Sequence, residues 1–453
     1  SVPSRDLTMR LLSFLPLLAL VPAALLFEPR EATSEAAPAR QASVRAFVGA
    51  RLVPVTADPI DDGVLVVRDG KIEALGPRGT VPIPADAEVV SWQGRTVLPG
   101  LICTHSHIGQ PWGADSSHPI QPDARAADAI DVRQPSVHRA RAGGITTVNC
   151  MPGSGHLISG QTLYMKLRLG ETIDDLAYFF EDGAYMGGLK MANGTNPQDD
   201  PPFPGTRAKS AALVRQKYLD AQEYKRKLDA AADDPEVDPP ARDLTLDPLV
   251  EVLEGKRMVH HHTHRHDDVM TVLRLAKEFG FRVTLHHVSE GWRVADEIAA
   301  AGVPCSVILV DSPGGKQEAT RMRFDTATRL DAAGVRLSFH TDDYITDSRL
   351  FLRSGALAVR AGLSEQKALE ALTIAAAEQL DLSERIGSLE VGKDADLCVL
   401  DGAPFSVYSQ VLETWVEGER VFDLSNPEDA IYAVGGRGAG DDVPFTGCCA
   451  NIR

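Results

Sequence analysis

Four apolar runs in this sequence end in side chains that can bind metals. The runs are VLPGLICTHSHIG (97–109), RMVHHHTHRH (257–266), VTLHHVSEG (283–291) and VRLSFHTDD (335–343). Three contain histidines at or near their ends, among them His105 and His107, and the fourth leads to Asp342. Imidazole and carboxylate are ligands of Zn²⁺, and bound zinc lowers the pKa of a water molecule to about 7. If these runs converge, they predict a divalent-metal site that activates water.

The order of the elements predicts how the runs could converge. Apolar strand-like runs alternate with amphipathic helical runs, such as a helix over 269–280 that stops at Gly280. This alternation predicts a parallel sheet, and a chain of 453 residues suits a (β/α)8 barrel with a smaller partner. Alternate strand residues face the same side, so His105 and His107 are expected to point together into the barrel mouth. The alternative, a pair of polar turn residues, would leave two inward imidazoles without partners.

Short strands flank the expected barrel on both sides. Residues 46–98 have the pattern of strands with a hairpin turn at Asp69–Gly70, and strands return after a helix predicted over 364–380. A long charged helix is predicted over 204–232. We therefore predict an α/β protein in which strands from both chain ends could join in one small β-domain. Its segments are the first part of this β-domain at 45–98, a (β/α)8 TIM barrel at 99–386, the second part of the β-domain at 387–425, and a flexible tail at 426–453.

Residues 1–44 are predicted to lie outside the fold. Arg10 precedes a nearly unbroken apolar run at 11–27, and a stretch rich in Ala, Glu and Pro follows. The run is short for a membrane span, so it has the pattern of a secretory signal or N-terminal anchor with a linker. The alternative is a buried core helix. We expect an exported protein, either periplasmic, secreted or anchored, whose only membrane contact would be this segment.

Composition limits the classes of partner. The 46 basic and 63 acidic side chains give a net charge of −17, and an acidic surface repels the phosphates of nucleic acids. The six cysteines are scattered, with neither zinc-like pairing nor the spacing of a disulfide framework. We expect a small-molecule substrate and no nucleic acid, and a homo-oligomer remains one of the options.

The motifs resemble those of a known family. TVLPGLICTHSHIG, GGITTVNCMPGSG, VHHHTHRHDDVMTVLRLAKEFG, TLHHVSEG, FHTDD and IGSLEVGKDADLCVLD occur in the order typical of the amidohydrolase superfamily. The chain looks nearest to its imidazolonepropionase-like and prolidase-like branch, over about residues 46–424. The resemblance implies a (β/α)8 barrel with a small β-sandwich and a metal-dependent hydrolase that acts on carbon–nitrogen bonds.

The resemblance assigns site residues one at a time. Many members bind one or two divalent ions, typically Zn²⁺, and carry a carboxylated lysine on the fourth strand, a position that Lys190 takes here. The alternative for Lys190 is a surface or ion-paired lysine. His264 is assigned as a catalytic residue that contacts substrate. The implied metal ligands are His105, His107, Lys190, His262, His287 and Asp342.

The ligand types predict the chemistry. Asp342 would take a proton from the activated water and pass it to the leaving nitrogen, a transfer that contributes about 10²–10⁴-fold in rate. Deaminase-like members have a Glu three residues after the fifth-strand His; Arg265 stands there, with no Glu nearby in the sequence. This favours amide, cyclic-amide or dipeptide hydrolysis over aromatic deamination. Arg321 and Arg323 are either substrate-carboxylate ligands or surface arginines.

Two other classes of function stay open. A catalytically inactive amidohydrolase-like barrel could serve as an assembly or binding module, although such proteins typically lose metal ligands that are present here. The interpretation as a nonenzymatic metal-binding protein is supported only by the histidine run at 260–266.

Overall fold

Strands from both ends of the chain pair in one sheet. The computed structural model describes residues 44–440 except 110–114, 116, 310–315 and 344. In sheet order the strands are β17 (Glu419–Asp423), β16 (Val411–Val416), β15 (Leu397–Leu400), β5 (Thr96–Pro99), β1 (Val44–Leu52), β2 (Ile60–Arg68) and β3 (Lys71–Pro77), with β4 (Glu88–Ser91) paired to β1. The antiparallel pairing of β15 with β5 joins the two ends of the chain. The division of this sheet into two sandwich layers stays a prediction.

Local sequence explains this β-domain. Asp69 and Gly70 both have positive φ, 49° and 79°, which is the backbone of a two-residue hairpin turn, so the predicted turn between β2 and β3 is confirmed. The core of the sheet is aromatic: Phe47 stacks on Trp92 with ring centroids 3.9 Å apart, and Trp415 meets Phe47 edge-on at 5.1 Å. These rings bury a large apolar area in a small domain.

A second group of strands forms the predicted parallel arrangement. One sheet has the order β14 (Leu337–Phe339), β13 (Cys305–Val307), β12 (Val283–His287), β11 (Val259–Thr263), β10 (Leu189–Ala192) and β8 (Ile158–Gln161), parallel except for β8. Another contains β6 (Leu101–Ser106), β7 (Ile145–Cys150) and β9 (Leu163–Lys166). Among the described residues these strands do not close into one ring. The fold is therefore mixed α/β, and the closed (β/α)8 barrel stays a prediction.

Contacts between the two sheets nevertheless bring their strand ends together. The Asp342 N–H donates to the His105 carbonyl (3.1 Å), which joins the end of β14 to the end of β6. One residue before His105, the Thr104 hydroxyl lies 2.6 Å from the Ser306 hydroxyl and 3.1 Å from that of Ser338. The buried ends of β6, β13 and β14 thus face one another.

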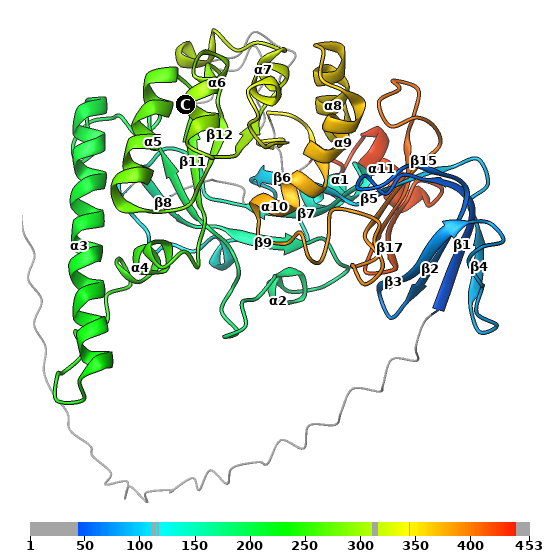
Figure 1. Cartoon of the computed structure of the whole chain (residues 1–453), viewed down its shortest axis with the longest axis horizontal. Coiled ribbons are helices and arrows are strands. Elements are labelled where there is room, and N and C mark those ends of the chain that lie inside the picture. Colours follow the sequence, from blue (N-terminus) through cyan, green and yellow to red (C-terminus); the bar gives the residue numbers. More distant parts are fainter. Residues whose placement is uncertain (1–43, 110–114, 116, 310–315, 344, 441–453) are drawn as a thin grey trace, which may run out of the picture. The chain divides into compact units, whose positions relative to one another are not determined.

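The helices follow their sequence signals with two exceptions. Figure 1 shows α5 beside β11, and α5 ends before Gly280, whose φ of 76° confirms the predicted stop. The helix expected over 364–380 is broken at Thr373. Part of the tail expected at 426–453 forms a helix, α11, where Asn426 is the N-cap and accepts from the Glu428 N–H. The helices are α1 (Pro135–Ala142), α2 (Ile173–Leu176), α3 (Arg207–Asp233), α4 (Asp247–Leu253), α5 (His266–Phe279), α6 (Ala295–Ala300), α7 (Thr326–Ala332), α8 (Phe351–Arg360), α9 (Glu365–Leu372), α10 (Ile374–Gln379) and α11 (Pro427–Val434).

A buried ionic cluster couples β9 to the β-domain. The Lys166 side chain is fully buried and its ammonium contacts the carboxylates of Asp394, Asp396 (3.1 Å) and Glu417 (3.2 Å). Burial would lower the pKa of Lys166, but these three carboxylates raise it above its usual value. Lys166 is therefore a charged structural residue.

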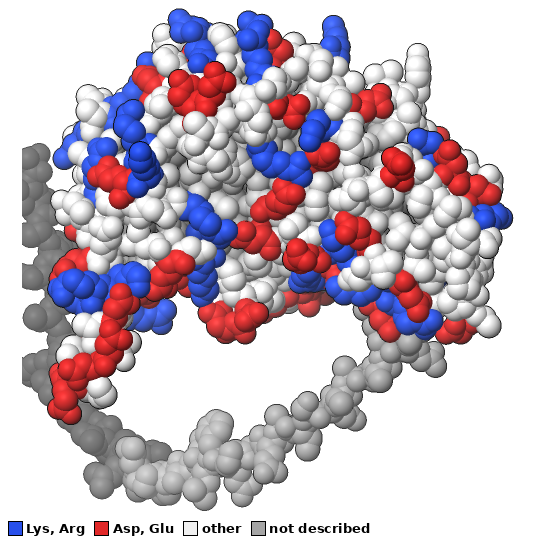
Figure 2. Space-filling view, viewed as in Figure 1, with Lys and Arg blue, Asp and Glu red and all other residues white. Residues whose placement is uncertain are grey.

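Charge on the visible face is mixed. Figure 2 shows acidic and basic side chains interspersed, with no large basic patch on this side. No helix among the described residues is both long and apolar enough to cross a bilayer. The predicted signal or anchor, residues 1–44, lies outside the described residues apart from Val44.

Candidate functional site

Two histidine rings converge at the end of β6. The Nε2 atoms of His105 and His107 are 3.3 Å apart, as the alternating strand pattern predicts. The Nδ1–H of His107 donates to the Met151 carbonyl (2.8 Å), and this bond fixes the orientation of the ring. His105 is fully buried, and its Nδ1 has no hydrogen-bond partner.

Asp342 completes this group from the end of β14. Its Oδ1 lies 3.0 Å from His107 Nε2 and 3.4 Å from His105 Nε2. Burial raises the pKa of Asp342, but the hydrogen bond to His107 and the charges of His107 and His340 outweigh it, so the net pKa lies below the usual range. Asp342 is thus an ionised carboxylate facing two imidazoles.

Lys190 enters the same group from β10. Its side chain is 0 % exposed, and its Nζ lies 3.1 Å from His105 Nε2 and 3.0 Å from the Met151 sulfur. Burial, only partly opposed by the charge of Asp342, lowers the pKa of Lys190 to about 7. The surface-lysine alternative is therefore excluded. We call His105, His107, Lys190 and Asp342 the four-residue centre.

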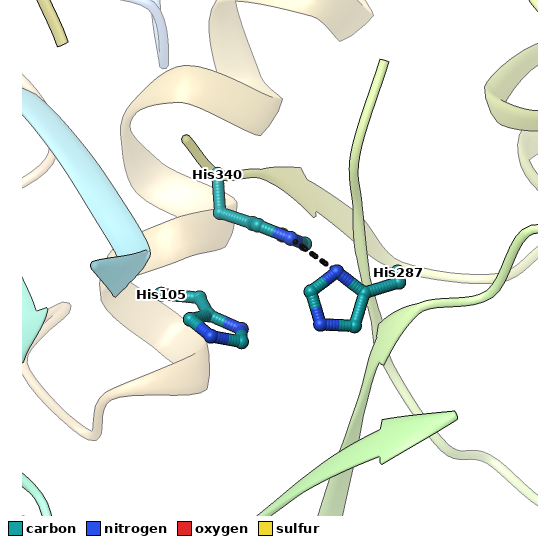
Figure 3. A group of neighbouring side chains, drawn as sticks. All are labelled: His105, His287 and His340. Atoms are coloured by element: carbon teal, nitrogen blue, oxygen red, sulfur yellow. Dashed lines mark hydrogen bonds between the residues drawn. The ribbon is translucent and has the colours of Figure 1, made fainter. Parts of the chain in front are cut away.

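His287 and His340 lie next to His105, with ring centroids 4.8 and 4.9 Å from that of His105. Figure 3 shows the three side chains and the hydrogen bond between His340 Nε2 and His287 Nδ1, which are 3.0 Å apart. His287 Nδ1 is also 4.0 Å from Asp342 Oδ2. Burial lowers the pKa of both histidines, to about 3 for His340, where the charge of Asp342 opposes it only in part. Both rings are therefore neutral at neutral pH and can offer lone pairs.

The remaining predicted residues form a second group next to His287. The ring of His262 is 4.4 Å from that of His287 and 4.6 Å from that of His264. The ligand atoms of His262, His264 and Glu318 all lie within 4.8 Å of one another, and we call these three residues the His262 cluster. A glutamate absent from the neighbouring sequence thus lies beside these histidines in space, because Glu318 comes from a 3-10 helix at Gln317–Ala319.

The sequence allows Arg321 and Arg323 to be either substrate-carboxylate ligands or surface arginines, and both are ion-paired and exposed. Arg323 forms two hydrogen bonds with Asp325 (2.6 and 2.9 Å). Arg321 is 62 % exposed and lies 3.6 Å from Glu290. Both positions fit the surface alternative.

Sequence reasoning left two residues near the site, His286 and Glu318, without a role. It placed His340 on the strand face of Asp342, as a residue that orients Asp342 or lines the pocket. His286 is buried beside His105, with ring centroids 5.0 Å apart, and bonds to His260. Glu318 had no sequence signal, because it lies on a loop segment 54 positions after His264.

The donor set fits a divalent cation. Among the described residues, both ring nitrogens of His262 and one each of His105, His264 and His287 are buried without hydrogen-bond partners. Unpaired buried polar atoms cost about 1–3 kcal/mol each, so a group of them facing one another needs an explanation. A cation that accepts their lone pairs supplies it.

Comparison with known proteins decides the family. The model of the amidohydrolase family matches residues 96–426. The chain belongs to this family. Within the superfamily it falls in the branch of the imidazolonepropionases and prolidases, and this membership supports a hydrolase that acts on carbon–nitrogen bonds.

The matches to individual solved structures cover most of the length of this amidohydrolase. An amidohydrolase structure from Thermotoga maritima MSB8 is 31 % identical, with a TM-score of 0.77, and the match covers 83 % of this chain and 99 % of that one. A prolidase complexed with N-methylphosphonate-L-proline has a TM-score of 0.55 at 17 % identity (84 % and 100 % covered), which shows the fold alone.

Two curated relatives are similar at the sequence level. Imidazolonepropionase of Rhizobium rhizogenes is 24 % identical over 394 residues, 79 % of this chain and 91 % of the relative. Amidohydrolase tasK of Hapsidospora irregularis is 24 % identical over 401 residues, 81 % of this chain. The match spans only 40 % of the length of that second relative.

Proposed function

We propose that this chain is a divalent-metal-dependent hydrolase that cleaves an amide, cyclic-amide or dipeptide bond. The observation that carries the proposal is the four-residue centre. In it two imidazoles, a carboxylate and a buried amine contact one another at interatomic distances of 3.0–3.4 Å. Its residues would hold one or two cations together with His262 and His287. A bound Zn²⁺ would supply a water of pKa about 7 and polarise the scissile carbonyl.

Asp342 is assigned the proton transfer. Its carboxylate is ionised and lies against His107 and His105, so it can accept a proton at Oδ1 or Oδ2. It would release that proton to the leaving nitrogen as the carbon–nitrogen bond breaks. His264 is assigned a substrate contact, because its Nε2 is buried and has no partner.

Lys190 is assigned as a carboxylated lysine. Carbon dioxide reacts with a neutral amine, and a lysine with a pKa of about 7 is substantially neutral at physiological pH. Lys166, equally buried but surrounded by carboxylates, keeps its proton and cannot react in this way. The carbamate of Lys190 would place a second carboxylate next to His105.

The intact donor set argues against an inactive barrel. None of the predicted protein ligands is replaced, and the structure buries all of them except the partly exposed His107 and Asp342. Relatives named imidazolonepropionase and prolidase support small cyclic amides and dipeptides as the first substrates to test. Export by residues 1–44 is proposed from the apolar run alone.

The test is a substrate screen on protein loaded with metal. The full chain, stripped with a chelator and reconstituted with Zn²⁺, is assayed against cyclic amides, dipeptides and N-acyl amino acids. We expect hydrolysis that disappears on stripping and in the His107→Asn variant. If the wild-type protein binds no transition metal and hydrolyses none of these classes, the proposal is wrong.

A further inference from the structure

A continuous series of hydrogen bonds leads through the protein core to His287, and Figure 3 shows its last bond. Its hydroxyls come from β6, β13 and β14 and its amide from α10, and each of its side chains is at most 2 % exposed. Serine, threonine and glutamine are mostly exposed in proteins, so a connected set of them in the core needs an explanation. We call the set the Ser306 network, and its members in order are Gln379, Ser338, Thr104, Ser306, His340 and His287.

The amide of Gln379 fixes the direction of the first two bonds. Its Nε2 donates to the Cys305 carbonyl (3.2 Å), which can only accept, so its Oε1 faces Ser338. The Ser338 hydroxyl therefore donates to Gln379 Oε1 (2.8 Å) and has no second proton to give. Thr104 Oγ1 lies 3.1 Å from Ser338 Oγ, and Thr104 must be the donor of this next bond.

The same direction continues to the histidines, because each hydroxyl has one proton. Ser306 donates to Thr104 Oγ1 (2.6 Å), since the Thr104 proton is already used, and the His340 Nδ1–H donates to Ser306 Oγ (2.6 Å). A neutral imidazole has one N–H, so His340 Nε2 accepts and His287 Nδ1–H donates across 3.0 Å. The lone pair of His287 is then on Nε2, which is buried without a hydrogen-bond partner among the described residues.

The backbone at the end of β12 supports a positioned ring. His287 has φ = 70° and Val288 has φ = 44°, both in the left-handed region. This conformation is uncommon for residues other than glycine, and for a β-branched residue such as valine it persists only where surrounding contacts hold it. The orientation of His287 therefore depends on its contacts, and the hydrogen bond to His340 is one of them.

We propose that the Ser306 network sets the tautomer of His287, and that His340 is a positioning residue and not a metal ligand. The inference rests on the proposed function, in which His287 binds a catalytic cation. The hydrogen bond at one nitrogen of a histidine decides which nitrogen is free to bind a metal, and here it frees Nε2. One nitrogen from each of His105, His287 and His340 lies within 4.8 Å of the others. His340 nevertheless has no lone pair to spare, because its Nδ1 donates and its Nε2 accepts.

The experiment measures which ring nitrogen of His287 is protonated, and the affinity for Zn²⁺. Full-length protein labelled with ¹⁵N-histidine is stripped of metal, and the His287 signals in its long-range ¹H–¹⁵N spectrum are assigned by their loss in His287→Gln. We expect the proton on Nδ1 in wild type. Ser306→Ala removes the acceptor that keeps the proton of His340 on Nδ1, so both tautomers of His287 should appear. Competition with a chelating dye should show Zn²⁺ bound about 10–100-fold more weakly by Ser306→Ala.

Thr284→Val is the matched control. Thr284 is a fully buried hydroxyl on β12, the strand of His287, but its Oγ1 has no hydrogen-bond partner among the described residues. This variant should keep the wild-type tautomer and affinity. His340→Phe keeps a ring but no nitrogen, and it should weaken Zn²⁺ binding as Ser306→Ala does.

Three results would overturn the inference. A wild-type His287 with its proton on Nε2 contradicts the direction of the bonds, and this reading needs no variant of the network. Loss of Zn²⁺ in His340→Phe, with unchanged tautomer and affinity in Ser306→Ala, would make His340 a ligand. Either result leaves the proposed function standing if the wild type binds Zn²⁺. A wild type that binds no Zn²⁺ refutes the proposed function and the inference together.

Discussion

Replacing Asp342 with asparagine is the sharpest test of the proposed chemistry. Asp342 has φ = 49°, a left-handed backbone conformation that asparagine tolerates and most other residues do not. Asparagine also keeps an oxygen that can occupy the place of Oδ1, 3.0 Å from His107. Asp342→Asn therefore removes the negative charge and the proton acceptor while it retains the shape of the site.

The expected loss follows from the role of the carboxylate. General acid–base transfer contributes about 10²–10⁴-fold, which corresponds to about 3–5 kcal/mol in the activation free energy. The ionised carboxylate lies within 3.4 Å of two imidazoles, and asparagine cannot take up a proton at that position. We expect kcat on the best substrate of the screen to fall by this factor.

The assay compares kcat and bound metal in the same samples. Asp343→Asn is the control, because Asp343 is the adjacent buried aspartate and accepts from the Ser348 hydroxyl (2.6 Å). Thermal melting confirms that each variant folds. If Asp342→Asn retains its metal and more than about a tenth of the wild-type kcat, Asp342 is not the proton shuttle and the reasoning from geometry fails.

Three further predictions concern buried charge. In protein equilibrated with ¹³C-bicarbonate, the wild type should give a carbamate NMR signal that Lys190→Met removes. The control Lys316→Met should keep it, because Lys316 is an exposed lysine just before the 3-10 helix Gln317–Ala319; a signal unchanged in Lys190→Met would contradict the carboxylation. Lys166→Met should lower the free energy of unfolding in urea by about 3–5 kcal/mol, since it leaves buried carboxylates without their cation; a change under about 1 kcal/mol would show that the cluster is not coupled to stability. Burial raises the pKa of Asp394, but its charge interaction and hydrogen bond with Lys166 have the opposite effect. Together with a hydrogen bond from Lys71 they lower the pKa to about 2. The pKa of Asp394 in the folded protein lies below the unfolded value of about 3.9. Asp394 therefore contributes about 2–3 kcal/mol to the free energy of unfolding above about pH 3.9, and this contribution is lost as the pH falls through about 2. Asp394→Asn should therefore show a flatter decline of unfolding free energy than wild type from about pH 5 to pH 2, and parallel curves would argue against this assignment.

The sequence predicts those site residues that follow directly from strand periodicity. His105 and His107 converge because residues two apart on β6 face the same side, and Asp342 meets them because β14 and β6 end at the same place. The break at Thr373 could not be predicted, because the alanine-rich run on both sides of it favours one continuous helix. Tertiary packing overrides that preference.

Glu318 shows a different limit of sequence reasoning. A residue on a short loop helix carries no periodic signal, and its approach to β11 depends on Thr195 and Arg207, which lie far away in the sequence. The argument that excluded a glutamate counted positions along the chain, whereas the site is defined by distances in space. The preference for amide hydrolysis over deamination therefore depends on substrate tests and not on Arg265.

The two fully buried lysines show why burial alone does not identify a functional group. Lys166 and Lys190 are both 0 % exposed, and burial opposes the charged form of each. Three carboxylates surround Lys166 and keep it protonated, so its charge is neutralised and it joins two parts of the fold. Lys190 instead contacts an imidazole and a thioether, neither of which is an anion. A buried amine without a directly contacting anion is costly as an ammonium, and a neutral amine beside metal-binding groups is available for chemistry. The partners of a buried charge therefore separate the structural lysine from the reactive one.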